Sequence, residues 1–266
     1  PRSQRRVHPM ARVEEVEAED ASSDDRLAVD APAPGEDARL AEETLGERVE
    51  RGAPPWEHPD WYDLHDDAWT AGIEREGEHY RELVLALPPL DALDHLVDVG
   101  CGTGKAATQI ARAYPGLGRV SLVEPTVAKL ERAEARVREA LPRAVVQSLS
   151  AGVGDGIRGL PSEATIVVAT SVLMPTMEYR GGTFADGVDW VLDALSELHG
   201  MLAQGGLLYV LETLPPPWTV ADVEGPVRRL AFGEFEAALE EAGFVDVECV
   251  YRFRDRVVFQ ASKDDA

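Results

Sequence analysis

The chain has 266 residues, with 49 acidic and 26 basic side chains and a formal net charge of -23 at pH 7. This length allows one large domain with a hydrophobic core of its own. The excess of acid argues against nucleic-acid binding, which needs a basic face, and against docking on an anionic membrane.

Other classes of protein are also disfavoured. The longest uncharged apolar stretch, residues 164–177, is too short to predict a transmembrane helix. The arginine-rich start is followed by acidic residues rather than by the apolar run of a secretory signal. Two cysteines, Cys101 and Cys249, cannot form a disulfide framework or a four-cysteine zinc site. These features predict a soluble, cytoplasmic protein.

The first 55 residues differ in composition from the rest. Residues 13–50 carry 14 acids and three arginines, and the first aromatic side chain is Trp56. A segment without aromatics buries too little apolar surface to offset its ordering entropy. We therefore expect an acidic, mostly disordered tail at 1–55, a helical cap at 56–95 and the main folded domain at 96–266.

Signals for helices and strands alternate from residue 56 onward. Apolar runs bounded by turn residues predict strands at 96–99, 120–123, 144–149, 165–170, 207–211, 244–250 and 256–261. Apolar residues at helical spacing predict helices at 61–87, 106–114, 127–141, 188–202 and 234–242. This alternation predicts an α/β fold, doubly wound around a mostly parallel seven-stranded sheet with helices on both faces. The last two strands have no helix between them and should form an antiparallel hairpin at one edge.

A glycine-rich loop follows the first predicted strand and opens the next helix. It reads Val-Asp-Val-Gly-Cys-Gly-Thr-Gly at 97–104, and Glu124 ends the second predicted strand. The ends of parallel neighbouring strands lie together, so a carboxylate there can accept hydrogen bonds from both hydroxyls of a ribose. The glycine spacing differs from the dinucleotide fingerprint Gly-x-Gly-x-x-Gly. The acid Asp98 favours a ligand with a cationic amine or sulfonium over one with phosphates.

These residues resemble the class I methyltransferases that use S-adenosylmethionine. The resemblance covers roughly residues 60–262. It rests on 97–104, on Glu124, on Leu-Ala-Gln-Gly-Gly-Leu-Leu-Tyr-Val at 202–210 and on Leu-Glu-Glu-Ala-Gly-Phe at 239–244. It implies a Rossmann-like methyltransferase domain at 96–266 and S-adenosylmethionine as cofactor. The cofactor-binding residues that it implies are Asp98, Gly100, Cys101, Gly102, Thr103, Gly104, Glu124, Pro125, Thr126, Ser150, Ala151 and Thr170.

The resemblance also implies which part of the cofactor each of these residues contacts. Asp98 and the loop would hold its methionine part, Gly100 through the backbone carbonyl, and Glu124 would bind the ribose hydroxyls. Pro125 and Thr126 would lie near the adenine. Many family members carry an Asp after the third strand that bonds the adenine amino group. Ser150-Ala151 occupy that place here, so either Ser150 or Asp155 could make the adenine contact.

The aromatic-rich stretch before the first strand is interpreted as a substrate cap, with packing against the sheet edge as the alternative. His58 and His65, with Tyr62 between them, are the candidate catalytic residues. Candidate substrate-binding residues are Trp61, Trp69, Glu178 and Trp218. Weaker candidates for a base, on loops after strands, are Glu178, Tyr179 and Glu212, although an acid in the place of Glu212 is more often a plain strand-end residue. No spacing of His, Asp and Glu indicates a metal site, and His95 and His199 are expected at the surface.

The expected function is methyl transfer to an oxygen or nitrogen of a small molecule, a bacterial secondary metabolite. No Asn-Pro-Pro-Tyr follows the fourth strand, and residues 51–266 carry 35 acids against 19 bases. Both facts disfavour a nucleobase acceptor. One alternative is methylation of a protein or peptide, the acidic chain attracting a basic partner. Another is a non-catalytic, cofactor-binding scaffold. The sequence does not fix the oligomeric state.

Overall fold

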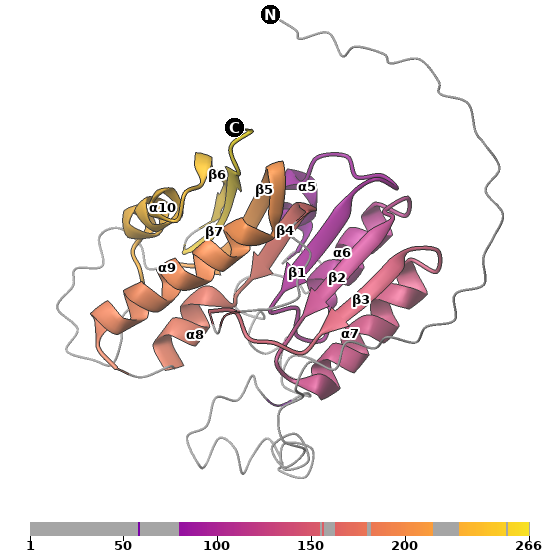
Figure 1. Ribbon diagram of the computed structural model, residues 1–266, viewed down its shortest axis with the longest axis horizontal. Coiled ribbons are helices and arrows are strands. Elements are labelled where there is room, and N and C mark those ends of the chain that lie inside the picture. Colours follow the sequence, from indigo (N-terminus) through magenta and orange to yellow (C-terminus); the bar gives the residue numbers. More distant parts are fainter. Residues whose placement is uncertain are drawn as a thin grey trace, which may run out of the picture. The chain divides into compact units, whose positions relative to one another are not determined.

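The computed structural model describes residues 80–154, 156, 163–179, 182–214, 229–253 and 255–265, together with His58. Figure 1 shows how the helices and strands of this part of the chain are arranged. In chain order they are α5 (Arg81–Ala86), β1 (His95–Val99), α6 (Lys105–Ala113), β2 (Arg119–Val123), α7 (Val127–Ala140), β3 (Val145–Leu149), β4 (Ala164–Thr170), α8 (Leu173–Tyr179), α9 (Phe184–Met201), β5 (Leu202–Thr213), α10 (Phe232–Glu241), β6 (Val245–Phe253) and β7 (Arg256–Ser262).

All seven strands form one sheet in the order β3-β2-β1-β4-β5-β7-β6. Within the part of the sheet ordered β3-β2-β1-β4-β5, adjacent strands are parallel to one another, because each connection between them crosses back over the sheet. β7 pairs antiparallel with both β5 and β6. The predicted doubly wound, mostly parallel sheet with an antiparallel edge hairpin is therefore confirmed.

Helices cover both faces of the sheet (Figure 1). Buried residues of α8, α9 and α10 pack with one set of strand side chains, which includes Val97, Val167 and Val210. Buried residues of α5, α6 and α7 pack with the opposite set, which includes Leu96 and Val168. The central strands are apolar on both sides because both of their faces are covered.

The register of the sheet brings several strand ends together. Val99, at the end of β1, lies beside Val123 of β2 and Ala169 of β4. Thr170, the last residue of β4, lies beside Leu211 of β5. The residues that follow these strands therefore meet along one edge. In open α/β sheets, ligands bind at this carboxyl edge, where the strand order reverses between β1 and β4.

Two elements differ from the sequence prediction. Helix α8 occupies a stretch that was expected to be a loop, so Glu178 lies in a helix. Pro175 is the third residue of α8, where a missing N–H leaves no hydrogen bond unmade. β5 begins five residues earlier than predicted, directly after α9 ends at Met201. Gly205 therefore lies within a strand instead of closing a helix.

His95 is buried in β1, so the prediction that it is exposed was wrong. Its Nε2 lies 2.9 Å from Ser121 Oγ on the adjacent strand β2. Burial, with a smaller contribution from Arg119, lowers the pKa of His95 to about 4. The ring is therefore neutral at physiological pH and serves the packing of the sheet. None of the described helices is both long and apolar enough to cross a membrane.

Candidate functional site

The loop from Gly100 to Gly104 turns sharply between β1 and α6. Gly100, Gly102 and Gly104 all have positive φ angles, of 65°, 53° and 80°, which only glycine adopts without strain. Space is also limited, because a Cβ atom on Gly100 would collide with the side chain of Val172. On Gly104 a Cβ would come within 2.7 Å of Ala133 Cα. The glycines are therefore required both by the backbone conformation and by the close approach of neighbours.

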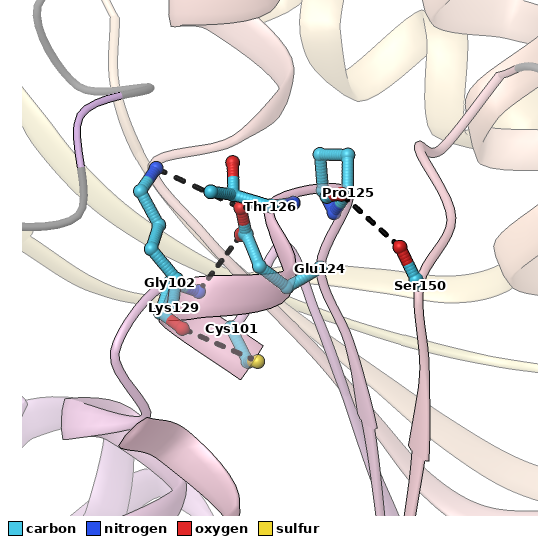
Figure 2. Close-up of polar contacts among 7 residues, drawn as sticks. All are labelled: Cys101, Gly102, Glu124, Pro125, Thr126, Lys129 and Ser150. Atoms are coloured by element: carbon cyan, nitrogen blue, oxygen red, sulfur yellow. Dashed lines mark hydrogen bonds and ion pairs between the residues drawn. The ribbon is translucent and has the colours of Figure 1, made fainter. Parts of the chain in front are cut away.

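Glu124 joins the end of β2 to this loop (Figure 2). Its Oε2 accepts a hydrogen bond from Gly102 N at 3.1 Å, and its Oε1 accepts one from Thr126 N at 3.2 Å. The side chain is almost completely buried. The carboxylate thus lies beside the glycine loop.

Lys129 also contacts Glu124 and was not among the residues predicted for the site. Its Nζ lies 3.6 Å from Glu124 Oε1, and only 4% of the Lys129 side chain and 6% of the Glu124 side chain are exposed. Figure 2 shows the ammonium approaching the carboxylate from helix α7. A signal for it exists in the sequence, since Lys129, Ala133 and Val137 follow at intervals of four and share one buried helix face.

Asp98 lies on β1, directly before the glycine loop, and is fully buried. Its Oδ2 accepts a hydrogen bond from Ala107 N at 3.2 Å. Its Oδ1 has no hydrogen-bond partner among the described residues. Burial raises the pKa of Asp98 to about 7; the Ala107 N–H opposes this shift and the charge of Glu124 adds to it. The residue therefore presents a buried acceptor that a cationic group would satisfy.

Replacing Asp98 by Asn should change how stability depends on pH. Between about pH 4 and pH 7 the folded chain holds a proton on Asp98 that the unfolded chain has lost. The free energy of unfolding therefore falls as pH rises through this window. Asp98→Asn lacks this contribution. The urea midpoint of Asp98→Asn minus the urea midpoint of the parent chain should therefore increase from pH 5 to pH 8. A constant difference across this range would contradict the assignment, and Asp189→Asn, at an exposed position, is the control.

Cys101 anchors the glycine loop through its backbone. Its backbone N donates to Val123 O at 3.0 Å, which ties the loop to the end of β2. Burial raises the pKa of the thiol well above its ordinary value, and the charges of Asp98 and Glu124 add to the effect. A thiol that stays protonated is a poor nucleophile.

Arg136 of helix α7 holds the middle of the glycine loop, and the sequence analysis missed it as well. Its guanidinium donates to the carbonyl oxygen of Thr103 at 2.9 Å and to the hydroxyl of Thr103 at 2.8 Å. Thr103 itself is buried. Two hydrogen bonds from one planar group fix both the position and the orientation of this residue.

Arg136→Ala should weaken ligand binding without unfolding the chain. The loop would lose two charge-assisted hydrogen bonds, so we expect roughly a tenfold loss of affinity for S-adenosylhomocysteine, measured by calorimetry. Arg138→Ala, two residues along the same helix at an exposed position, is the matched control and should bind normally. Equal affinity in both variants would contradict a role for Arg136 in the site.

The residues expected near the adenine also lie together. Ser150 Oγ donates to Pro125 O at 3.1 Å, which connects the ends of β3 and β2 (Figure 2). Thr126 is the N-cap residue of α7, as predicted, although its side chain makes no capping hydrogen bond. Beyond Ala151, Glu197 of α9 accepts hydrogen bonds from Gly154 N at 2.8 Å and Gly156 N at 2.6 Å. This carboxylate holds the loop after β3 against α9.

The turn after β4 packs against the glycine loop. Ser171 has a positive φ of 52°, and its N donates to Leu211 O at 2.7 Å. Glu212 Oε1 then accepts from Val172 N at 3.0 Å and Leu173 N at 2.7 Å. Burial raises the pKa of Glu212 to about 7. Glu212 therefore lies at the end of β5, as expected of a strand-end acid and not of a loop residue, and it fixes the turn that places Val172 against Gly100.

Glu178 forms a bidentate ion pair. Its carboxylate oxygens lie 2.9 Å from Nε and 2.9 Å from an Nη of Arg229, whose other Nη donates to Thr213 O at 3.0 Å. Burial alone would lower the pKa of Arg229. The hydrogen bond to Glu178 and the negative charge of Glu178 raise this pKa instead. This pair connects α8, the end of β5 and the residues that precede α10. The substrate-binding role of Glu178 stays a prediction.

Most of the residues predicted to be catalytic or substrate-binding are not described by the structure. Those outside the described residues are Trp61, Tyr62, His65, Trp69 and Trp218. His58 is described and is buried. Their roles stay predictions. Within the described ranges, no group of three or more His, Cys, Asp or Glu side chains could hold a metal ion.

The chain was compared with known proteins by sequence. No model of a protein family matches. Over 85 residues the chain is 36% identical to a trans-aconitate 2-methyltransferase from Paracidovorax citrulli (strain AAC00-1). This match covers 30% of this chain and 30% of that protein, so it spans under a third of either.

Solved structures give broader matches. The apo form of the S-adenosylmethionine-dependent methyltransferase SibL aligns with 86% of this chain and 62% of its own length, at 20% identity and a TM-score of 0.55. The pyocyanin biosynthetic protein PhzM aligns with 86% of this chain and 70% of its own, at 17% identity and a TM-score of 0.56. The [4+2]-cyclase SpnF covers 71% of this chain and 81% of its own, at 18% identity and a TM-score of 0.54.

These likenesses define the class of the fold. The described chain has the Rossmann-like fold of the class I S-adenosylmethionine-dependent methyltransferases, and the resemblance expected from the glycine loop is confirmed at this level.

Proposed function

We propose that this chain binds S-adenosylmethionine and transfers its methyl group to an oxygen or nitrogen of a small molecule. The observation that carries the proposal is the hydrogen bond between Gly102 N and Glu124 Oε2. It joins the loop that would hold the methionine part of the cofactor to the acid that would hold its ribose.

The residues present fit such a cofactor. Asp98 offers a buried oxygen, Oδ1, without a partner among the described residues, and a cationic amino group would satisfy it. The carbonyls of Cys101, Thr103 and Gly104 already accept hydrogen bonds from Gly104 N, Arg136 and Thr108. These three carbonyls are thus engaged within the loop and the helix, and the carbonyl of Gly100 stays the expected acceptor for the ligand.

The protein would contribute mainly by placing the reactants. When bound, S-adenosylmethionine supplies an electrophilic methyl group on a positively charged sulfur. In-line transfer requires an acceptor held close to that carbon with water excluded. Thr170 and Ser171 end β4 beside the glycine loop and are half-buried, so they would flank the acceptor. If the acceptor must lose a proton, His58, His65 or Tyr62 would take it.

The acceptor class is the inferred part of this proposal. The acidic composition of the chain disfavours nucleic acid as substrate, and a small bacterial secondary metabolite fits the aromatic composition of residues 56–80. SpnF, which shares the fold, is a cyclase. Cofactor binding by itself would therefore not establish methyl transfer.

Two measurements test the proposal. Calorimetry should detect binding of S-adenosylmethionine and S-adenosylhomocysteine to the full chain. A screen of small hydroxyl- and amine-bearing acceptors should then reveal one that leads to S-adenosylhomocysteine formation. Absence of binding would refute both the cofactor and the reaction. Binding without turnover on any small acceptor, but with turnover on a basic peptide, would favour the peptide as substrate.

A further inference from the structure

Lys129 occupies a place where lysine is rarely found. Lysine side chains are almost never fully buried unless they are paired, and removing a charge from water is costly. Lys129 is 3% exposed and lies on the face of α7 that also buries Leu130 and Ala133. Its ammonium is directed to Glu124, at 3.6 Å from Oε1, and not to the solvent.

The acceptors of Glu124 are partly occupied before any ligand binds. A carboxylate offers about four acceptor sites on its two oxygens. Gly102 N takes one on Oε2, while Oε1 receives Thr126 N and faces Lys129. A ribose hydroxyl that donates to Oε1 would therefore lie next to the ammonium. Because a hydroxyl both donates and accepts, its oxygen can accept from Lys129 while its hydrogen is donated to Glu124.

We propose that Lys129 and Glu124 recognise the ribose diol of the cofactor together, the carboxylate as acceptor and the ammonium as donor. This inference rests on the proposed function. It makes Lys129 a specificity-determining residue: loss of one hydroxyl would remove a group that both the Glu124 carboxylate and the Lys129 ammonium contact in a buried site. Such a site discriminates more strongly than a carboxylate alone.

The test measures the affinity of the full chain for three nucleosides by calorimetry. They are S-adenosylhomocysteine and its 2′-deoxy and 3′-deoxy analogues, and the variant is Lys129→Met. In the parent chain, removal of the hydroxyl that contacts both side chains should lower affinity roughly 100-fold. Lys129→Met should bind S-adenosylhomocysteine about tenfold or more weakly than the parent chain does. Within Lys129→Met, the analogue without that hydroxyl should bind only about tenfold more weakly than S-adenosylhomocysteine.

Lys263→Met is the matched control. Lys263 is a lysine whose Nζ donates to two carbonyls, His199 O and Leu202 O, away from the glycine loop. Its removal should leave the ratio between the three ligands unchanged. If Lys129→Met unfolds because Glu124 is left buried without a counter-charge, Glu124→Gln is compared with Glu124→Gln/Lys129→Met. Loss of Lys129 in this neutral background should again reduce the discrimination.

The outcomes separate this inference from the proposed function. If the parent chain binds S-adenosylhomocysteine but the loss of Lys129 leaves the ratio between the three ligands unchanged, Lys129 has only a structural role and the inference is overturned. If the parent chain binds none of the three, the proposed function fails and the inference fails with it. A reduced ratio in Lys129→Met with an unchanged ratio in Lys263→Met supports both.

Discussion

Glu124→Ala should lower the affinity of the chain for S-adenosylmethionine by at least about 100-fold. Each hydrogen bond to a charged acceptor contributes about 1.5–3 kcal/mol, and a ribose diol would make two, while 1.4 kcal/mol corresponds to a tenfold change in affinity. The substitution also removes the acceptor of Gly102 N and Thr126 N and the counter-charge of Lys129. The glycine loop would thus lose its side-chain connection to the end of β2 together with the ligand contacts, and would keep only the backbone hydrogen bond from Cys101 N to Val123 O. Calorimetric titration of the full chain measures the effect.

Two further variants separate binding from folding. Glu124→Gln keeps the size and one acceptor of the side chain but leaves Lys129 without its counter-charge, so it should be less stable than the parent chain and, at a temperature where thermal unfolding shows it folded, should bind more weakly. Glu131→Ala removes an acid from an exposed position on the same helix, α7, and should not alter affinity. Binding by Glu124→Ala that equals binding by Glu131→Ala would exclude Glu124 from the cofactor site.

Some substitutions of the loop glycines would displace the backbone of a neighbouring element. Among these, Gly104→Ala should give the largest loss of stability. A non-glycine residue in the left-handed conformation costs about 1–2 kcal/mol, and Gly104 has φ +80°. The new Cβ would also lie 2.7 Å from Ala133 Cα, which forces α6 and α7 apart at a further cost of about 1–3 kcal/mol. For a domain of this size the melting temperature should fall by roughly 5–15 °C. Differential scanning calorimetry measures it.

Gly116→Ala provides the matched comparison for this prediction. Gly116 follows α6 in an exposed turn, and a Cβ there would have no atom within 4 Å. The two variants make the same chemical change near opposite ends of helix α6. Gly116→Ala should leave the melting temperature nearly unchanged, and a similar fall in both variants would mean that crowding at Ala133 does not matter.

The fold was predictable because its signals are local. The apolar runs that became β1, β2 and β4 are buried on both faces and end at glycine, at acid or at a turn. The glycine loop and Glu124 are also read directly from short stretches of sequence, since their spacing follows from the geometry of one strand-loop-helix unit. Their contact at 3.1 Å required only that β1 and β2 be parallel neighbours.

The parts that were not predicted depend on contacts between distant residues. His95 at the start of a strand looks exposed until Ser121, 26 residues away, is placed beside it. The segment after β4 contains Pro175 and reads as a loop, but Glu212, about 40 residues later, accepts the first backbone N–H groups and allows α8 to form. Such partners cannot be identified from the periodicity of one segment.

Lys129 is an intermediate case. Its spacing from Ala133 and Val137 places it on the buried face of α7, but a charged residue among apolar ones is ordinarily assigned to the helix boundary and to solvent. The position of Glu124, three residues before the helix, helps to explain why the charge is tolerated. A buried charge therefore becomes interpretable once its partner is known.

The hydrogen bond between Arg229 and Thr213 has a consequence for how this protein can diversify. The end of β5 and the residue that precedes α10 by three positions, Arg229, lie at nearly the same point, because the Arg229 guanidinium bonds the Thr213 carbonyl at 3.0 Å and Glu178 holds it there. When the ends of a connection are already held together, lengthening it costs little entropy. The stretch between them can thus be exchanged, shortened or extended in evolution or by engineering while the sheet and the cofactor-binding residues stay as they are.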